Sequence, residues 1–513
     1  NQIRRMAAAL KALNLPEKSN IAIISKNCAH WIMSDLAIMM SGHVSVPLYP
    51  TLNAEKTQEI LLHSQARVIF IGKLDNWAEL KEGIPENLRG ITYPQSPAES
   101  ADFEQWDNLI AQYEPLSGEY RPHLDELATI IYTSGTTGMS KGVMHSYYTL
   151  IYPVLIAAPI AGVGSTSDRF FSYLPLSHIA ERALIELAGL YAGGSISFVE
   201  SIDSFRQNLV DTLPTVFLAV PRIWTKFQQN ILEKVPQKRL DALLSIPLLS
   251  GIIRKKIKKS LGLNQARCII TGAAPMPLAL LTWFRKLGIN IQEAYGMTEN
   301  VGCCTFMRAT QIKTGTVGQA YPQCTLKIDP ETGEILMKAE WITLGYYREP
   351  KKTAEIIKDG WLHTGDMGEL DAEGFLKITG RIKDQFKGAK GEFIVPGPIE
   401  AAYATNHNIE QICVIGRGMP QPIALVVLSE LGQKLAQINW QALEESLEAT
   451  RDAANRSLVS YEKIQKIITV KEAWSVENQC LTPTLKIKRN VLEEKYGSQL
   501  ENWYDQKKSV IQE

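Results

Sequence analysis

Short runs of β-branched and apolar residues alternate along the chain with longer stretches of helical periodicity. Residues 21–24, 67–71 and 129–132 are runs of the first kind, and residues 54–64 are a stretch of the second kind. Strands that alternate with helices are typical of layered α/β architecture. The pattern therefore predicts an α/β fold with largely parallel sheets.

The pattern of predicted elements changes in the last two fifths of the chain. Between residues 315 and 380 short strands and turns prevail, as where the turn 329–333 separates two short apolar runs. Beyond residue 384 a loop rich in glycine and lysine is followed by helix and strand patterns. We expect an N-terminal domain of layered α/β subdomains over residues 1–383, a β-rich subdomain at about 315–380, and a small α+β domain over residues 384–513.

Composition restricts the partners and the compartment. The 54 lysines and arginines balance the 54 aspartates and glutamates, which argues against nucleic acid as a partner. The seven cysteines are scattered without a C-x-x-C pair, which favours reduced thiols and a cytoplasmic protein. The apolar run 150–163 is interrupted by prolines, so it predicts a buried helix and not a membrane span. Since the chain opens at Asn1 inside an amphipathic run, we expect that an N-terminal segment is missing, so any targeting signal there cannot be read.

A loop suited to polyphosphate follows the apolar strand 129–132. Glycines let backbone amides approach an anion closely, hydroxyls donate hydrogen bonds, and a lysine adds positive charge. The spacing differs from that of a Walker A loop, and an ordinary solvated turn is the alternative interpretation. The candidate ligands are Thr133, Ser134, Gly135, Thr136, Thr137, Gly138 and Lys141.

Further blocks follow this loop in a fixed order. They are GAAPMP (272–277), EAYGMTE (293–299), WLHTGD (361–366), GRIKD (380–384) and PTLKIKR (483–489). Together with the loop they resemble the signature blocks of the AMP-forming acyl- and aryl-CoA synthetase, luciferase and peptide-synthetase adenylation superfamily. The resemblance implies an AMP-forming acid–thiol ligase with ATP, Mg²⁺ and coenzyme A as cosubstrates.

The resemblance assigns roles in nucleotide binding. Adenylation joins a carboxylate to the α-phosphorus of ATP, so such a site must align reactants and neutralise charge. The loop would cover the β- and γ-phosphates, Thr298 would bind phosphate oxygen, and Glu299 would bind Mg²⁺. Tyr295 would stack on adenine, Asp366 would accept hydrogen bonds from the ribose hydroxyls, and Arg381 would contact the ribose or the α-phosphate. The remaining members of the expected adenine-binding wall and its block are Gly272, Ala273, Ala274, Glu293, Ala294, Gly296 and Met297.

Each of these residues also has a plain structural interpretation. Glu299 alone is a surface carboxylate, Tyr295 a core aromatic, and Asp366 a turn residue. The occurrence of all the blocks together, in a fixed order, favours the functional roles.

The C-terminal block carries the lysine that would bridge the carboxylate and the α-phosphate. Lys486 fits because an arginine, Arg489, follows three positions later; Lys488 does not fit this spacing. A basic surface run is the alternative. The resemblance also implies that the mobile C-terminal domain turns about a hinge at Asp384, which removes the lysine before thioester formation.

Other segments point to the acyl and thiol channels. His178 in the block 174–182 would shape these channels, although a lone histidine is more often structural. Trp224 in the block 220–224, typical of the long-chain branch, would help form the tunnel entrance, with core packing as the alternative. The loop 387–392, with Gly388, Lys390 and Gly391, would approach the pantetheine tunnel, or is a plain flexible loop.

The sequence departs from the family pattern at two positions. Ser140 stands where most members have proline, which leaves the loop less restricted without removing a ligand. Glu392 stands where many members have lysine.

Residues 246–261 combine apolar and basic residues at helical spacing. Such a helix can rest on an anionic membrane, while a solvated basic face on a packed helix is the alternative. We expect an acyl-CoA synthetase for a medium- or long-chain fatty acid, cytoplasmic or peripheral at the membrane. The rivals are a ligase that loads an acyl carrier protein or stops at the acyl-adenylate, and a non-catalytic binding homologue.

Overall fold

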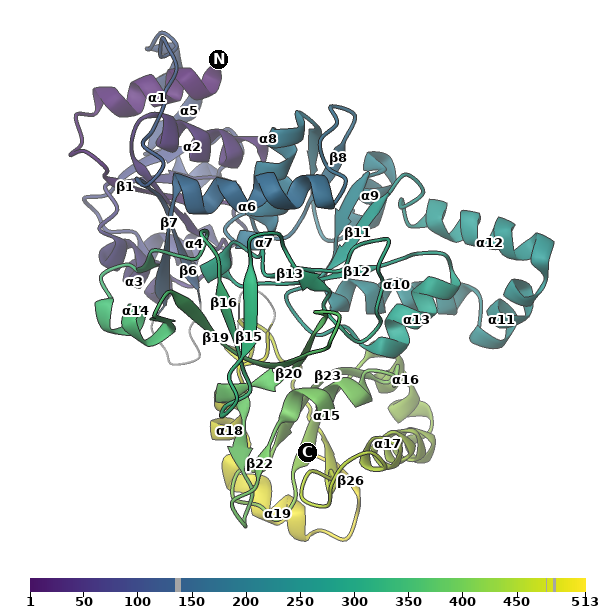
Figure 1. Ribbon diagram of the computed structural model, residues 1–513. Helices are drawn as coiled ribbons and strands as arrows, with labels where there is room; N and C mark the ends of the chain where they lie inside the picture. Colours follow the sequence, from purple (N-terminus) through teal and green to yellow (C-terminus); the bar gives the residue numbers. More distant parts are fainter. Residues whose placement is uncertain (134–139, 477, 483–485) are drawn as a thin grey trace.

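The computed structural model describes residues 1–133, 140–476, 478–482 and 486–513. A large N-terminal body stands above a smaller C-terminal domain, and the chain passes from one to the other beyond strand β20 (Leu376–Arg381) (Figure 1). The α/β class expected from the sequence is confirmed. The cysteines, all of which lie in the described ranges, are free thiols.

The first sheet positions the start and the end of the candidate phosphate loop. Its inner strands pair in parallel and are buried along their whole length, as in a sheet covered on both faces. The hairpin β6–β7 flanks the loop, since β6 ends at Thr133 and β7 begins at Lys141. In spatial order the strands are β17 (Gly345–Tyr346), β7 (Lys141–Ser146), β6 (Leu127–Thr133), β2 (Val44–Leu48), β1 (Asn20–Ile24), β3 (Val68–Ile71), β4 (Arg89–Thr92) and β5 (Glu104–Gln105).

The second sheet carries the expected adenine wall. Its strands from β9 to β12 are parallel, and β13 and β14 continue it in antiparallel pairing. Ligands of parallel sheets bind beyond the carboxyl ends of the strands, and Tyr295 is the last residue of β12. The order is β14 (Gln319–Ala320), β13 (Thr305–Phe306), β12 (Gln292–Tyr295), β11 (Cys268–Thr271), β10 (Val216–Leu218), β8 (Arg169–Ser172) and β9 (Ser195–Phe198).

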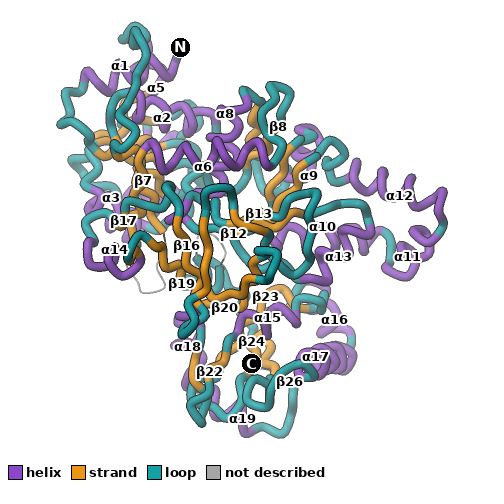
Figure 2. The backbone as a smooth tube through the Cα atoms, in the orientation of Figure 1, coloured by secondary structure: helices purple, strands orange, loops and turns teal. Residues whose placement is uncertain are grey.

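The third sheet and the β21–β22 pair are antiparallel, whereas the four-stranded C-terminal sheet is mixed, with β23–β24 antiparallel and β24–β25–β26 parallel. The third sheet lies where short strands were predicted, and two small sheets build the C-terminal domain (Figure 2). The third sheet contains β15 (Thr325–Ile328), β16 (Glu334–Lys338), β19 (Trp361–Leu370), β18 (Ile357–Lys358) and β20. The C-terminal sheets contain β21 (Phe386–Lys387) with β22 (Phe393–Ile394), and β23 (Ile409–Ile415), β24 (Ile423–Leu428), β25 (Lys466–Thr469) and β26 (Val510–Gln512).

Helices cover the faces of the parallel sheets and both faces of the C-terminal sheet (Figure 1). In the N-terminal body they are α1 (Gln2–Ala12), α2 (Ala29–Met40), α3 (Ala54–Ser64), α4 (Trp77–Leu80), α5 (Trp106–Ala111), α6 (Tyr147–Ile160), α7 (Ile179–Glu181), the π-helical turn η3 (Arg182–Leu187), α8 (Ala188–Ala192), α9 (Phe205–Thr212), α10 (Pro221–Lys234), α11 (Gln237–Ser245), α12 (Pro247–Ser260), α13 (Leu278–Lys286) and α14 (Pro350–Ile356). In the C-terminal domain they are α15 (Pro396–Tyr403), α16 (Glu430–Ile438), α17 (Trp440–Asn455), α18 (Arg489–Tyr496) and α19 (Leu500–Asp505).

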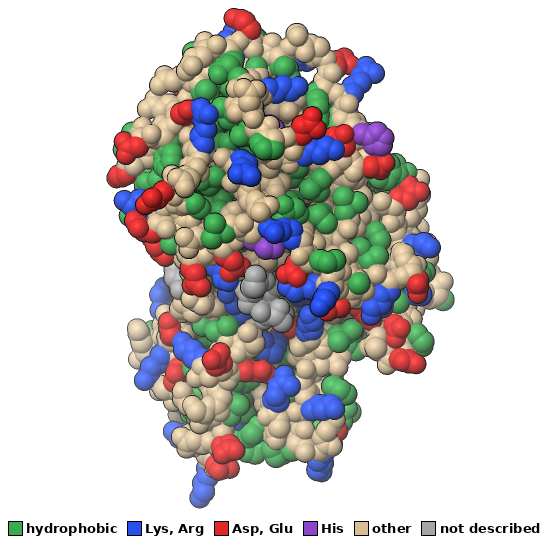
Figure 3. Space-filling model, turned by 90° about the vertical axis from the view of Figure 1, so that its left-hand side faces the viewer, with side chains coloured by type: hydrophobic (Ala, Val, Ile, Leu, Met, Phe, Trp, Pro, Cys, Tyr) green, Lys and Arg blue, Asp and Glu red, His purple; other side chains and the backbone are tan. Residues whose placement is uncertain are grey.

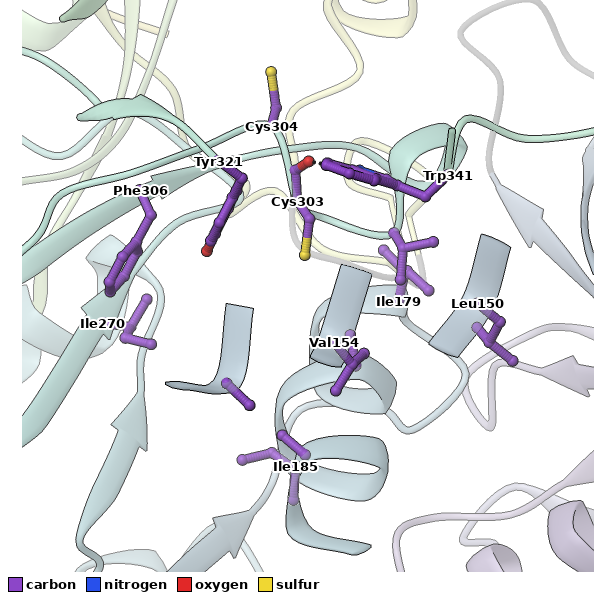
Figure 4. Packing of buried hydrophobic residues seen from close by; sticks show 14 of the residues in the cluster. Leu150, Val154, Ile179, Ile185, Ile270, Cys303, Cys304, Phe306, Tyr321 and Trp341 are labelled. Atoms are coloured by element: carbon purple, nitrogen blue, oxygen red, sulfur yellow. Dashed lines mark hydrogen bonds between the residues drawn. The ribbon is translucent and has the colours of Figure 1, made fainter. Parts of the chain in front are cut away.

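The largest apolar core lies between α6, η3 and the second sheet. Leu150 and Val154 of α6 share this interior with Ile270 of β11 (Figure 4). The indole Nε1 of the fully buried Trp341 donates to the carbonyl of Cys303 at 2.9 Å. The interior therefore satisfies its indole polar group while excluding water. None of the helices in the described ranges is long and apolar enough to cross a membrane.

A charged cluster is buried where the first sheet meets η3. Arg182 donates to both carboxylate oxygens of Asp35 at 2.6 Å, and both side chains are fully buried. Glu186, one helical turn later, lies 3.7 Å from the Arg182 guanidinium. Burial raises the pKa of Glu186 well above its ordinary value, aided by the charge of Asp35 and opposed by Arg182. The cluster thus combines the Asp35–Arg182 ion pair with a carboxyl group whose protonated form is favoured by burial.

Candidate active site

Asp366 is the centre of the candidate site. It lies on β19 directly across from Arg381 on β20, whose Nε is 2.7 Å from one carboxylate oxygen. The hydroxyl of Tyr295 donates to the other oxygen at 2.7 Å. Antiparallel pairing of β19 with β20 and the end of β12 therefore bring three predicted nucleotide-binding residues together.

A buried glutamate holds the stretch of β19 directly before Asp366. Gly365 has φ of +72°, a conformation that glycine adopts without strain. Its N–H donates to Glu334 at 2.8 Å, and the other oxygen of Glu334 lies 2.8 Å from Nδ1 of His363. Glu334 thereby fixes the approach of the strand that presents Asp366.

Lys486 reaches this centre from the C-terminal domain. Burial lowers its pKa to about 8, the Arg381 guanidinium adds to that effect, and Asp366 and Glu299 oppose it. The ammonium group thus faces the residues expected to surround the ribose, the α-phosphate and the metal. Lys488 faces elsewhere, since the charge near its ammonium group is that of Lys56 on α3.

Arg489, three residues after Lys486, has a structural role within the C-terminal domain. Its guanidinium donates to Glu400 of α15 at 2.8 Å and to the carbonyl of Val414. Glu400 in turn accepts the N–H of Val414 at 2.7 Å. This network fixes the start of α18 and therefore the segment that carries Lys486.

His178 lies beside Lys486 at the start of α7. Its Nδ1 accepts the N–H of Ala180 at 3.2 Å, which caps the short helix and leaves the proton on Nε2. Burial and the nearby Lys486 lower its pKa to about 4, so the ring is neutral at physiological pH. A neutral, tethered ring suits the predicted role in shaping a channel.

Glu299 and Lys141 share a common neighbour, Tyr346 of β17. The tyrosine hydroxyl donates to Glu299 Oε1 at 2.7 Å, and the Lys141 ammonium lies 4.9 Å from the centre of the tyrosine ring. Burial and Lys383 lower the pKa of Lys141, while Glu299 opposes them. A buried carboxylate beside cationic phosphate ligands fits Mg²⁺, which binds through one or two carboxylates together with substrate phosphates.

A buried histidine positions Thr298 through its backbone carbonyl. Nε2 of His145 donates to the carbonyl of Thr298 at 2.8 Å, and Nδ1 lies 3.2 Å from the Thr149 hydroxyl. Burial lowers the pKa of His145 to about 4, which keeps the ring neutral. The short helical turn of residues 298–300 is thereby fixed against β7.

The residues of the expected adenine wall lie at the ends of β11 and β12. A Cβ at Gly272 would lie 2.9 Å from the carbonyl oxygen of Ala294, and one at Gly296 would lie 2.2 Å from the backbone of Gly302. The small residues are therefore required by close backbone approach. Ala273 and Ala274 are exposed, and burial raises the pKa of the nearby Glu293 to about 7. Met297 follows at the start of the next turn.

Charged side chains of both signs gather at the waist between the N-terminal body and the C-terminal domain (Figure 3). Thr133 and Lys141 pair across β6 and β7 at this end of the first sheet. The other predicted loop ligands, Ser134, Gly135, Thr136, Thr137 and Gly138, lie outside the described residues, as do residues 483–485 of the lysine block.

Trp224 does not join the site. It is fully buried among Phe217, Phe227 and Phe284, and its indole donates to the carbonyl of Ala219 at 3.1 Å. The structure therefore favours core packing over the tunnel entrance. Packing beneath the second sheet determines where Trp224 lies, and residue type alone does not predict that location.

The loop of Gly388, Lys390 and Gly391 also lies apart from the site in this conformation. It forms the tip of the β21–β22 hairpin, and Ala389 donates to the carbonyl of Met419 within the C-terminal domain. Asp384 ends a short turn directly after β20, where the chain leaves the third sheet. Their roles in domain rotation stay predictions.

The sequence patterns did not point to Tyr346, Glu334 or His145. These residues position the predicted ligands through contacts between segments that are far apart in the chain. No spacing or composition distinguishes them from ordinary core and surface residues.

Comparison with known proteins shows the family of this chain. Residues 1–347 match the AMP-binding enzyme family, and residues 383–508 match the AMP-binding enzyme C-terminal domain. Long-chain-fatty-acid–CoA ligase FadD15 of Mycobacterium bovis is 29% identical over 98% of this chain and 91% of its own length. Long-chain-fatty-acid–CoA ligase 1 of Cavia porcellus is 30% identical over 94% of this chain and 78% of its own length.

Solved structures share the fold. The anthranilate CoA ligase AuaEII in complex with anthranoyl-AMP superposes with a TM-score of 0.78 at 21% identity, over 98% of this chain and 92% of that chain. The A-PCP didomain of a carboxylic acid reductase from Segniliparus rugosus gives 0.81 at 22% identity, over 98% of this chain and 75% of that chain. The chain therefore belongs to the AMP-binding enzyme family. Within it, the chain is an AMP-forming acid–thiol ligase of the long-chain acyl-CoA synthetase branch.

Proposed function

We propose that this enzyme activates a medium- or long-chain fatty acid with ATP and transfers the acyl group to coenzyme A. The observation that carries the proposal is the approach of Lys486 from the C-terminal domain to Arg381, Asp366 and Glu299 of the N-terminal body. Curated relatives over most of the chain are named as long-chain-fatty-acid–CoA ligases, which supports the substrate class.

In the first half-reaction a carboxylate oxygen of the fatty acid attacks the α-phosphorus of ATP. The bond from that phosphorus to the bridging oxygen breaks, and pyrophosphate leaves. Lys486 would lie between the attacking carboxylate and the α-phosphate and offset their repulsion. Asp366 would exchange its bonds to Tyr295 and Arg381 for the ribose hydroxyls, which frees the tyrosine ring to pack against adenine.

Glu299 and the hydroxyl-bearing Thr298 would hold Mg²⁺ and phosphate oxygen beside Lys141. The metal ion would supply charge neutralisation on the departing pyrophosphate. Tyr346 keeps the Glu299 carboxylate oriented before ATP arrives.

In the second half-reaction the sulfur of coenzyme A attacks the acyl carbon, and AMP leaves. We propose that the domain of residues 384–513 turns about Asp384 between the two steps. This rotation would withdraw Lys486 and bring the loop of Gly388, Lys390 and Gly391 toward the thiol, a hinge motion of the common kind.

The adjacent lysines provide the sharpest test. Lys486→Ala is expected to lower fatty-acid-dependent pyrophosphate exchange by about 100-fold or more, the usual effect of losing one preorganised charge. Thioester formation from supplied acyl-AMP should be largely retained. Lys488→Ala is the matched control and should exchange like the wild type. Equal loss in both variants, or none in Lys486→Ala, would refute the assignment.

Two measurements separate the rival functions. Pyrophosphate exchange that depends on a fatty acid excludes a non-catalytic binding protein. Comparison of coenzyme A with an acyl carrier protein as the acceptor then distinguishes the synthetase from a carrier-loading ligase. A screen of carboxylic acids by pyrophosphate release gives the preferred chain length.

A further inference from the structure

The helical hairpin α11–α12 extends from the body away from the candidate site (Figure 1). One side of it packs on the core beneath the second sheet through Leu240, Leu244, Ile253 and Ile257. None of the α12 residues is buried, which is unusual for a helix of this length. Most of its surface therefore faces solvent.

The outward face of this hairpin is apolar at one end. Leu248 is 87% exposed and Ile252, one turn later, is 62% exposed. Ile246 and Leu249 beside them are 46% and 39% exposed. Single exposed apolar residues are ordinary, but a group of adjacent ones marks an interaction surface.

The other end of the same face is basic. Lys255, Lys256 and Lys259 are exposed and follow Ile252 at helical spacing, so they lie on its side of α12. No ion pair within the described ranges involves these three lysines. Arg254 and Lys258 turn inward instead, where Arg254 donates to the carbonyl of Lys286 at 3.0 Å and Lys258 lies beside Gly288.

This combination fits one partner. Residues 246–261 contain no acidic side chain, although the whole chain carries equal numbers of acidic and basic residues. Apolar side chains next to lysines match the boundary between the acyl chains and the anionic headgroups of a bilayer. A second copy of the chain would place like charges face to face, and a nucleic acid would leave the exposed leucine and isoleucines without apolar contacts.

We infer that α12 docks the enzyme onto an anionic membrane surface, with Leu248 and Ile252 inserted and Lys255, Lys256 and Lys259 at the headgroups. This goes beyond the proposed reaction and does not depend on it. Docking here leaves the waist between the two domains free to move, because the hairpin belongs wholly to the N-terminal body.

The test is flotation of the full chain with vesicles of phosphatidylcholine and phosphatidylglycerol, and with vesicles of phosphatidylcholine alone. The wild type should float with the anionic vesicles and be released by high salt. The triple variant Lys255→Gln/Lys256→Gln/Lys259→Gln should partition about 100-fold more weakly, on the basis of the usual contribution per lysine. The double variant Leu248→Ser/Ile252→Ser should also lose binding, even at low salt.

Matched controls lie elsewhere on the surface. Lys81→Gln/Lys434→Gln/Lys507→Gln removes three exposed lysines, and Ile202→Ser/Ile438→Ser removes two isoleucines that are 90% and 83% exposed. Both should float like the wild type. Equal flotation of the wild type with neutral and anionic vesicles, or unchanged flotation of the α12 lysine variant, would overturn the inference. The inference would also be overturned if the wild type failed to float and instead formed a dimer that Leu248→Ser/Ile252→Ser dissociates.

Discussion

The backbone N–H of Ser140 donates to Oε1 of Glu59 on α3, with 3.0 Å between nitrogen and oxygen. Glu59 also pairs with Lys56 one turn earlier on the same helix. Proline has no N–H, so this bond exists only because residue 140 departs from the family pattern. It ties the residue before Lys141 to a helix of the first sheet.

Substitution of either Ser140 or Glu59 should break this bond and weaken ATP binding. Ser140→Pro and Glu59→Leu are each expected to raise the KM for ATP in pyrophosphate exchange by about five-fold, from ~1 kcal/mol for one hydrogen bond. The double variant should be no worse than either, because both changes remove the same interaction. Ser140→Ala keeps the N–H and should match the wild type. Additive effects, or an equal effect of the alanine, would show that the bond has no role.

The charge of Lys486 should limit adenylation at alkaline pH. Its pKa is about 8 because of burial and the neighbouring Arg381, so the cationic form predominates below pH 8 and is lost as the pH rises. The kcat/KM for pyrophosphate release should therefore fall about tenfold per pH unit above that value. Asp366, Glu299 and the neutral His178 are the other titratable groups that face it.

Lys486→Arg provides the control for this profile. Arginine stays charged throughout the accessible range, so the variant should lose the alkaline decline even if its rate is lower. A decline that persists unchanged in Lys486→Arg would assign the ionisation to another group.

An ion pair joins the two domains in this conformation. Arg222 of α10 contacts Glu410 of β23, with the side chains 37% and 32% exposed. Glu410→Gln should slow adenylation by about five-fold at most, since half-exposed pairs contribute up to ~1 kcal/mol. Thioester formation from supplied acyl-AMP should be unchanged or faster. Glu430→Gln on the same domain is the control, and equal slowing of both half-reactions by Glu410→Gln would contradict a role in this conformation.

In the buried cluster of Asp35, Arg182 and Glu186, replacing Asp35 or Glu186 by its amide should change the free energy of unfolding by different amounts. Asp35→Asn leaves the Arg182 charge unpaired and should cost ~3–5 kcal/mol of unfolding free energy in urea. The raised pKa of Glu186 favours its protonated form in the folded protein, so stability from this group falls as the pH rises. Glu186→Gln should therefore be as stable as the wild type or more stable. Comparable destabilisation by both changes would show that Glu186 is ionised in the native state.

The sequence alone determined the fold class and the family, and it supplied the candidate ligands. Periodicity distinguishes strands from helices because each buries one face at a fixed repeat. The blocks around Tyr295, Asp366, Arg381 and Lys486 predicted a nucleotide site through their resemblance to the signature blocks of the adenylating superfamily. These are local properties, which neighbouring residues in the chain are enough to specify.

Only the tertiary structure decided how the residues meet. It placed Lys486, which the spacing to Arg489 already favoured, beside Arg381 and Asp366. It also buried Trp224 in the core, an outcome that does not follow from spacing along the chain. The bond from Ser140 to Glu59 spans 81 positions in sequence. The exposure of α12 likewise depends on which of its residues the N-terminal body covers. Hydrogen bonds, ion pairs and burial depend on separation in space, and folding sets that separation for residues that the chain keeps far apart.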